Sequence, residues 1–529
     1  MLHHMTRLLQ PEHPDLRMRN KVEKLTLTAA IGISSLLLLP AYARAQMIAP
    51  NAWLNLDSPI ELLPRENYVM PRPAPSAIPF RPTISASAYA AAKKAAAANY
   101  SPVEPAPFAP VPAAPPTMVF KNFSGASQID TTRPPDTEGA VGATQFVETT
   151  NSQVNIYNKS DASLAKSVTL ASFFNYTTQA LFDPRVVYDP VWKRWIVTAD
   201  AFAESSSIQK FYIAISKTSN AAGAFYIYNI NVTSFLSVGD FWDFPQVGFD
   251  QDAVIFTANV FGSSNAYKGA YAFPMAKALL YNGRSGSAPV FGPLVGTLAP
   301  PIVLDQNANT FLIAAPAPLT SGSTFTKYTM TNSSHPASTA LVASTITLPS
   351  AYSIPPSAHQ PGTTALLDTS DSRFVNASTQ NGNDLWQTHT IALSGSATPK
   401  FYRINTAVNT ISQSGFFFQT NTSDDFNASI TANANGDSFV TWTATDPAAS
   451  RNAQAMFSGK RSADTAIPAP GGVVGVISST FYDTTDAKER WGDYSAITID
   501  PSSTSKAWLV NEKINSTTLW GSQIMQVSF

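Results

Sequence analysis

Acidic, basic and aromatic side chains recur at one position of a repeated pattern, at the start of a short apolar run. Glu138 and Asp136 are carboxyl groups that could serve as acid or base, and Tyr494 could organise a substrate beside them. The candidates for ligand binding are Arg133, Arg185, Asp243, Gln246, Arg490 and Asp493. Because guanidinium groups bind carboxylates through two parallel hydrogen bonds, three arginines and a tyrosine near several carboxylates suit an acidic sugar.

The same residues have a structural interpretation. An Asp at the start of a strand often accepts hydrogen bonds from backbone amides in a turn, and Arg–Asp pairs often join neighbouring sheets. A structural device should recur in every copy of the pattern, whereas a catalytic group is needed once. On that criterion Glu138, Arg490 and Tyr494 are the better functional candidates. Trp242 and Trp491 either stack on sugar rings or fill the core, and packing is favoured.

Other kinds of site find little support in the sequence. The chain has only six His residues and no His-Glu-x-x-His pattern, so we predict no catalytic zinc and no other metal or cofactor. The acidic turns "DTSDSR" and "DTTDAKE" lack the spacing of an EF-hand loop. No Gly-x-Ser-x-Gly elbow nominates a serine nucleophile.

The elements that must position these candidates are short strands. After Met118, short runs of Val, Ile, Phe, Tyr, Trp and Thr are divided by Asp, Asn, Gly and Ser turns, which is typical of strands. One layout occurs seven times, about 45 to 65 residues apart: a polar or Pro-containing start, an apolar strand, a turn and a second strand. The copies are "PDTEGAVGATQFVETTN" from Pro135, "DPRVVYDPVWKRWIVTA" from Asp183, "DFPQVGFDQDAVIFTAN" from Asp243, "APPIVLDQNANTFLIAA" from Ala299, "HQPGTTALLDTSDSRFVNAS" from His359, "FNASITANANGDSFVTWTA" from Phe426 and "WGDYSAITIDPSSTSKAWLV" from Trp491.

This repeat predicts an all-β fold, a seven-bladed β-propeller with four antiparallel strands in each blade. The stretches "FYIAISKT", "GAYAFPM" and "DLWQTHTI" are predicted to be third strands of their blades. The stretch "TMVFKNFSG" from Thr117 should supply the outer strand that closes the ring beside the terminal "IMQVSF". A pair of antiparallel sandwiches is the alternative, but it does not explain seven similar copies.

The 529-residue chain divides into three parts by composition. Residues 1–45 have the charged, apolar and small-residue regions of a secretory signal peptide, and Met18 is the more ordinary start; an anchoring helix is the alternative. Residues 46–118 are rich in Pro and Ala and predict a largely disordered linker, with a segment packed on the domain as the alternative. Residues 119–529 form the propeller. The chain contains no Cys, so burial alone must stabilise it.

Five of the motifs together resemble a known family. They are "RPPDTEGAVGATQFVETTNS", "DPRVVYDPVWKRWIV", "DFPQVGFDQDAVIFTANVF", "HQPGTTALLDTSDSRFVNAS" and "RWGDYSAITIDP". In this order they resemble a group of secreted, largely uncharacterised bacterial β-propeller proteins with sialidase-like repeats. The resemblance implies fold and export. Sialidase catalysis is not carried over, because the Ser-x-Asp-x-Gly-x-x-Thr-Trp turn of sialidase blades is not present in that form.

The sequence therefore predicts an exported recognition module, secreted, periplasmic or at the cell surface. Its ligand would be a glycan or a cell-surface protein, bound at the mouth of the central channel where the innermost strands begin. The net charge of −1 gives no basis for a nucleic-acid partner, and we expect a monomer with no membrane insertion after signal cleavage. The alternative is a glycan-cleaving enzyme, which would need two carboxyl groups across the funnel.

Overall fold

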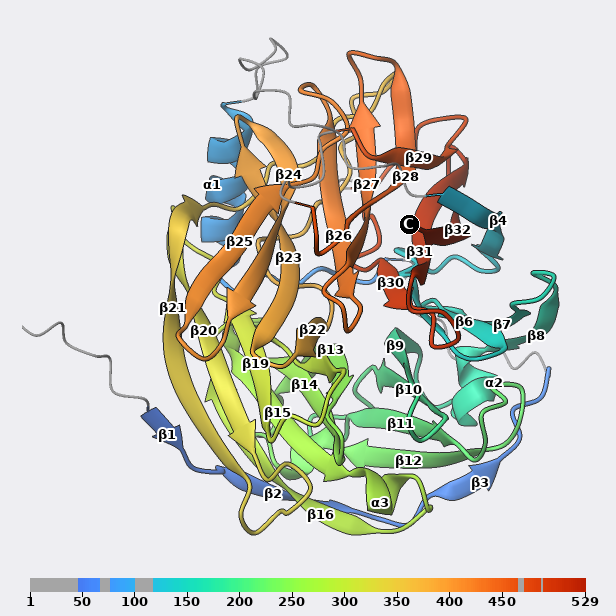
Figure 1. Ribbon diagram of the computed structural model, residues 1–529, viewed down its shortest axis with the longest axis vertical. Helices are drawn as coiled ribbons and strands as arrows, with labels where there is room; N and C mark the ends of the chain where they lie inside the picture. Colours follow the sequence, from blue (N-terminus) through green and yellow to red (C-terminus); the bar gives the residue numbers. More distant parts are fainter. Residues whose placement is uncertain (1–45, 67–76, 100–117, 465–470, 487–488) are drawn as a thin grey trace, which may run out of the picture. The chain divides into compact units, whose positions relative to one another are not determined.

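A computed structural model describes residues 46–66, 77–99, 118–464, 471–486 and 489–529. The predicted signal peptide lies outside the described residues. Strands dominate the described chain, and most of them form antiparallel units of four in which each strand pairs with the next strand of its unit (Figure 1). No helix in the described ranges is long and apolar enough to cross a membrane.

The units follow one another along the chain. The first contains β5 (Glu138–Val141), β6 (Gln145–Thr149), β7 (Gln153–Asn158) and β8 (Leu164–Thr169). The second contains β9 (Leu181–Asp189), β10 (Arg194–Ala201), β11 (Lys210–Ser216) and β12 (Phe225–Asn231). The third contains β13 (Phe241–Phe249), β14 (Ala253–Phe261), β15 (Tyr267–Ala276) and β16 (Gly286–Leu294). The fourth contains β17 (Thr297–Ala299), β19 (Asn309–Ala315), β20 (Gly322–Thr331) and β21 (Ala340–Tyr352).

Three further units complete the series. The fifth contains β22 (Ser378–Asn381), β23 (Asp384–Leu393), β24 (Ser396–Asn405) and β25 (Thr410–Phe416). The sixth contains β26 (Asp424–Ala432), β27 (Ser438–Asp446), β28 (Arg451–Lys460) and β29 (Val473–Ile477). The last contains β30 (Ala496–Ile499), β31 (Lys506–Ser516), β32 (Leu519–Ser528) and β4 (Met118–Ser127). Short helices α2 (Leu170–Phe174), η1 (Val232–Ser234) and α3 (Lys277–Leu280) lie in the connections.

The innermost strands surround a common axis. In the fourth unit the innermost place is taken by β18 (Pro301–Val303), which directly follows β17. In turn, β5 contacts β9, β9 contacts β13, β13 contacts β18, β18 contacts β22, β22 contacts β26, β26 contacts β30, and β30 returns to β5. Neighbouring sheets bury apolar side chains between them, with Trp195, Trp242 and Trp442 among the largest. This closed order of strands makes the fold a β-propeller, as the repeat predicted.

The prediction for the closing strand is confirmed. Strand β4, from the beginning of the domain, pairs antiparallel with β32 at the end of the chain, with Phe123 opposite Ile524. Glu148 of β6 reinforces this closure, because its carboxylate accepts a hydrogen bond from the backbone N–H of Ala126 in β4 at 2.9 Å and another from Ser522 of β32. The pairing joins the first and last strands of the domain in one sheet, with β4 at its outer edge.

One copy of the repeat was wrongly placed. The stretch from His359 was predicted to hold a strand pair, but its residues form bends and an isolated bridge between Ala358 and Leu367. The pair lies further on, in β22 and β23, so that "DLWQTHTI" is a second strand and not a third. Leu367, Phe374 and Val375 of this stretch are buried in three different hydrophobic clusters. Their burial gives the stretch an apolar pattern similar to that of a strand.

The prediction of a largely disordered linker is wrong for the described residues of 46–118. Strand β1 (Gln46–Ile48) pairs with β21, β2 (Ala52–Leu56) with β16 and β3 (Ile60–Leu62) with β12, each at the outer edge of a sheet (Figure 1). Helix α1 (Ala86–Ala97) begins at Ser85, whose hydroxyl caps Ala88 N–H at 3.2 Å, and buries Tyr89. Backbone pairing along exposed sheet edges fixes these residues, and composition alone does not reveal it.

Candidate functional site

The candidate residues from the sequence gather where the innermost strands begin, which we call the closed end of the channel. Asp136 lies between the first and last units: its carboxylate accepts hydrogen bonds from the Asp493 backbone N–H at 2.6 Å and from Asn151 Nδ2 at 2.6 Å. Tyr494 donates its hydroxyl to Asp183 at 2.8 Å. All of these side chains are buried, so they staple neighbouring sheets.

Arg185 crosses the middle of the channel. Its guanidinium donates to Glu138 and to Asn376 Oδ1, both at 2.9 Å, and through Nε to the carbonyl of Pro245 at 2.8 Å. It also lies 3.4 Å from the centroid of the Tyr494 ring, a cation–π contact. Arg185 therefore joins strands from several units and blocks the channel at this level.

Arg490 forms the second buried ionic centre of the closed end. Its guanidinium makes a two-pronged pair with Asp493, at 3.0 and 2.9 Å, and donates to Asp368 at 3.0 Å. Its Nε donates to the carbonyl of Ile78 at 3.1 Å, in the segment that precedes α1. Each hydrogen-bonding contact of Arg490 is thus made inside the protein, and only 6% of the residue is exposed.

The remaining candidates lie at the edge of this cluster. Arg133 makes a two-pronged pair with Asp486, at 2.7 and 2.8 Å, away from the buried centre. Gln246 donates to the carbonyl of Val375 at 2.9 Å, and Asp243 pairs with Arg81 at 3.3 Å. The structure therefore brings together every predicted residue except Arg133, and it uses them in internal contacts.

Burial changes the acidity of the two predicted catalytic carboxyls. Desolvation raises the pKa of Asp136 to about 6, assisted by the neighbouring Asp493 carboxylate. Desolvation likewise raises the pKa of Glu138 to about 7, against the opposing effect of Arg185. Glu138 can therefore gain or lose a proton near neutral pH.

The two predicted aromatic candidates fill the core. Trp242 is 0% exposed and packs in the cluster between the second and third units, while Trp491 is 1% exposed and donates its indole N–H to Thr443 at 3.3 Å. Neither ring is available to stack on a sugar, so the packing interpretation is confirmed.

An open cavity lies at the other end of the channel, where the innermost strands end. It encloses about 300 Å³ and all the innermost strands contribute to its wall. The wall is largely aliphatic, with Val141, Val187, Ile302 and Ile430 among its residues. Glu138 and Asn376 line its inner limit, and its outer limit is formed by turns that contain exposed residues such as Leu304. We call this the open end.

The cavity holds one carboxyl group. Of the described residues that line it, Glu138 is the single acidic side chain, and 11% of that side chain is exposed. A glycoside hydrolase needs two carboxyl groups facing the same substrate. Asp136, Asp183 and Asp493 are instead buried in the closed end, so the geometry gives the glycan-cleaving alternative no support.

Several buried residues of the closed end were not among the candidates predicted from the sequence. Asp371 and Arg373 form a buried two-pronged pair at 2.8 and 2.9 Å inside "DTSDSR", one of the acidic turns of the sequence. Asp200, within an apolar strand, is also buried, and desolvation raises its pKa well above the ordinary value. The Asp and Arg two positions apart in "DSR" were a usable signal for the ion pair, whereas nothing local marks Asp200.

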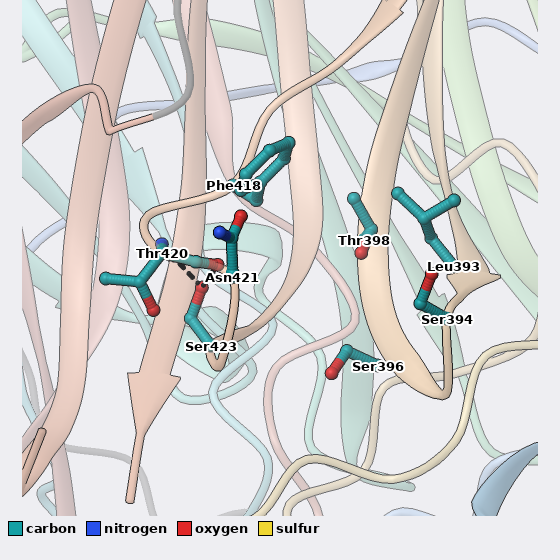
Figure 2. Close-up of a pocket in the computed structure, with 8 residues that line it drawn as sticks. All are labelled: Leu393, Ser394, Ser396, Thr398, Phe418, Thr420, Asn421 and Ser423. Carbon is teal, nitrogen blue, oxygen red and sulfur yellow. Dashed lines mark hydrogen bonds between the residues drawn. The ribbon is translucent and has the colours of Figure 1, made fainter. Parts of the chain in front are cut away.

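A second hollow lies beside the hairpin that joins β23 to β24 (Figure 2). Its lining is rich in hydroxyl groups, and Ser423 Oγ accepts a hydrogen bond from Thr420 N–H at 2.9 Å. The space inside is about 20 Å³, enough for about one water molecule. This hollow is too small for an organic ligand.

Comparison with known proteins identifies no family. No protein-family model matches the chain, and no curated protein matches it. Among solved structures, the Dos1 propeller is similar with 8% identity and a TM-score of 0.36, covering 73% of this chain and 74% of that one. An exo-β-1,3-galactanase from Phanerochaete chrysosporium, in complex with β-1,3-galactotriose, is similar with 11% identity and a TM-score of 0.31, covering 77% and 96%. The WD40 domain of SCAP from fission yeast is similar with 9% identity and a TM-score of 0.33, covering 77% and 91%. These likenesses concern the fold alone.

Proposed function

We propose that the protein is an exported, monomeric recognition module that binds a small, largely apolar ligand at the open end of its channel. The observation that carries this proposal is the cavity of about 300 Å³ with a largely apolar wall and, among the described residues that line it, one carboxyl group, that of Glu138. Small-molecule sites have this character: a concave apolar surface with few polar groups that orient the ligand. The signal-like residues 1–45 support export.

The wall favours an apolar body over the glycan that the sequence suggested. Sugar hydroxyls that leave water need hydrogen-bond partners. Side chains such as Val187, Ile302 and Ile430 offer none, and the polar side chains among them are mainly single hydroxyl groups of Thr and Ser. At the inner limit, the Glu138 carboxylate can accept a hydrogen bond from a hydroxyl or amino group of the ligand. The proposed ligand class is therefore a small apolar molecule with one donor group at its end.

The first test measures binding of N-phenyl-1-naphthylamine, a small apolar amine whose fluorescence rises in apolar surroundings. Ala377→Leu should weaken binding about tenfold or more, because Ala377 lines the cavity and the larger side chain occupies it. Ala448→Leu, the same change at an exposed turn, is the matched control. Equal affinity of Ala377→Leu and the wild type would contradict the proposal. If neutral or acidic oligosaccharides displaced the probe and n-octanol did not, the result would contradict the apolar ligand and favour a glycan.

A second test addresses Glu138. Because the pKa of Glu138 is about 7, its negative charge develops between pH 6 and pH 8. The n-octylammonium ion keeps its charge over this range, so it should displace the probe several-fold more effectively at pH 8 than at pH 6. Glu138→Gln should abolish that difference while retaining probe binding. If the pH dependence is unchanged in Glu138→Gln, the amino group of the ligand does not bind beside Glu138.

A further inference from the structure

Residues 78–82, with the sequence Ile-Pro-Phe-Arg-Pro, lie against the closed end of the channel. The backbone N–H of Ile78 donates to the carbonyl of Arg133 at 2.8 Å. Further along, Tyr89 of α1 donates to the carbonyl of Ser370 at 3.2 Å, and Lys93 donates to Thr369 at 2.7 Å. The segment and the helix therefore cover the buried ionic cluster.

Two backbone carbonyls of this segment bind to two arginines of the propeller. Arg490 donates to the carbonyl of Ile78 at 3.1 Å, and Arg373 donates to the carbonyl of Arg81 at 2.8 Å. Ile78 and Arg81 both precede prolines, which restricts each of them to extended backbone. An extended Pro-rich segment makes no internal hydrogen bonds, so its carbonyls are available to an external donor. The spacing of the prolines thus matches the spacing of the two donors.

The two arginines are held in place by contacts that do not involve the segment. Asp371 binds Arg373 through two hydrogen bonds, at 2.8 and 2.9 Å, and Asp493 binds Arg490 through two more, at 3.0 and 2.9 Å. Each guanidinium is fixed in orientation by its own carboxylate and retains N–H groups directed at the segment. A recognition surface that is already ordered needs little reorganisation on binding.

The side chains of the segment add specificity. The Phe80 ring lies under both guanidiniums, with its centroid 4.6 Å from Arg373 Cζ and 5.5 Å from Arg490 Cζ. Arg81 pairs with Asp243 at 3.3 Å and lies 4.2 Å from the centroid of the Phe241 ring. The propeller therefore contacts an aromatic residue, a basic residue and the carbonyls of both pre-proline positions.

The segment is not packed continuously onto the domain. A cavity of about 520 Å³ lies between residues 79–86 and the loop Ser264–Tyr267. The anchoring contacts of Phe80, Arg81 and the two carbonyls consequently hold most of the segment in place. A segment bound through a few specific contacts can be exchanged without unfolding the sheets beneath it.

We propose that the closed end is a recognition site for extended, proline-containing peptides with an adjacent aromatic and basic residue, and that residues 78–82 are its intramolecular ligand. The chain thereby occupies its own site, and a peptide of the same chemistry competes with this segment. This second site is separate from the apolar cavity at the open end, so either proposal can fail without the other.

The test uses the full chain and a fluorescent peptide that spans residues 77–84. The double variant Phe80→Ala/Arg81→Ala loses both side-chain anchors, so its own segment should compete less well. It should bind the peptide about tenfold more tightly than the wild type does, as measured by fluorescence anisotropy. A peptide with alanine at both anchor positions should not bind. Ser87→Ala, an exposed position of α1, is the control and should behave as the wild type.

A second measurement keeps the test decisive if the double variant does not fold. In the wild type, excess unlabelled peptide should increase amide hydrogen exchange in residues 77–84, because it occupies the site whenever the segment leaves. Exchange in β14 should not change. Failure of a folded double variant to bind the peptide overturns the proposal, and so does unchanged exchange of residues 77–84 in the wild type.

Discussion

The two ends of the propeller channel differ in the charge of the side chains that surround them. At the closed end, Arg185, Arg490 and their carboxylate partners are buried and bind one another across several sheets. At the open end, the same strands present aliphatic side chains around an unfilled cavity of about 300 Å³. Charged residues at the start of an inner strand therefore act here as staples, while the open cavity is lined mainly by apolar residues, with Glu138 as its one acidic side chain among the described residues. The difference cautions against locating a site from charged residues alone.

Removing a buried arginine should have the largest effect. Arg490→Ala leaves Asp368 and Asp493 without their cation, and breaking a buried ion pair costs about 3–5 kcal/mol of unfolding free energy. Chemical denaturation would measure the loss. Arg403→Ala is the control, because the side chains of the Arg403–Asp384 pair are 35% and 29% exposed and such pairs contribute about 0–1 kcal/mol. Similar losses in the two variants would show that the closed end is not an ionic staple.

The second prediction concerns Asp425, at the start of inner strand β26. Burial raises its pKa to about 8, although Ser423 and Trp442 hydrogen-bond to it. The folded state holds this proton more tightly than the unfolded chain does, so the stabilisation is complete below the unfolded pKa and is lost as pH rises through about 8. The decrease is about 1.4 kcal/mol per pH unit within that window.

Asp425→Asn should therefore reduce the fall in unfolding free energy between pH 6 and pH 7.5 by roughly 2 kcal/mol relative to the wild type. The amide can accept the hydrogen bonds from Trp442 and the Gln419 backbone and donate to Ser423, so the variant should fold. Denaturation curves at several pH values would test it. An unchanged slope would mean that Asp425 is ionised in the folded protein at neutral pH.

The third prediction compares one substitution at two places. Ala377→Leu places the extra atoms in the open cavity and should change the unfolding free energy by less than about 1 kcal/mol. Ala444→Leu places them in the packed core of the sixth unit, where Ala444 is 0% exposed, and should cost about 1–3 kcal/mol. Thermal denaturation of both variants gives the difference. A larger loss for Ala377→Leu than for Ala444→Leu would show that the cavity is not available space.

The smallest effect is expected at the outer edge of the second unit. Lys217 pairs with Glu61 of β3 at 2.6 Å, but their side chains are 34% and 61% exposed. Lys217→Ala should lower the unfolding free energy by less than about 1 kcal/mol, because exposed ion pairs contribute little and backbone pairing holds β3. If Lys217→Ala lowered the melting temperature by more than Arg403→Ala does, the Lys217–Glu61 pair would contribute more to stability than an exposed ion pair.

Local patterns were sufficient to predict most strands. The turn after β9 illustrates the reason: Asp189 accepts hydrogen bonds from Val191 N–H and Trp192 N–H at 3.0 Å, so the residues that define the turn are adjacent in sequence. Asp500 does the same for Ser502 N–H at 2.8 Å, at the corresponding turn after β30. The stretch from His359 was misplaced because its buried apolar residues serve packing between sheets and not a strand.

The structure brings the candidate residues together, except Arg133, but the sequence did not show what they do there. Glu138, Arg490 and Tyr494 were selected because they depart from the repeated pattern, and the structure uses all three in internal contacts. Only Glu138 also reaches an open cavity. Whether a carboxylate faces a partner or a cavity depends on side chains from distant units, which a local pattern does not contain.

The sequence by itself determined the repeated strands, their turns and the closing strand, because backbone preference and apolar periodicity act over a few residues. Only the tertiary structure decided which end of the channel is open. That outcome depends on contacts between residues that are far apart in the chain, such as Asp136 with Asp493 and Arg185 with Asn376, and on residues 78–82 lying across the closed end. Burial forces these charged groups to find partners, and the chain can supply them only once the sheets are assembled around the axis.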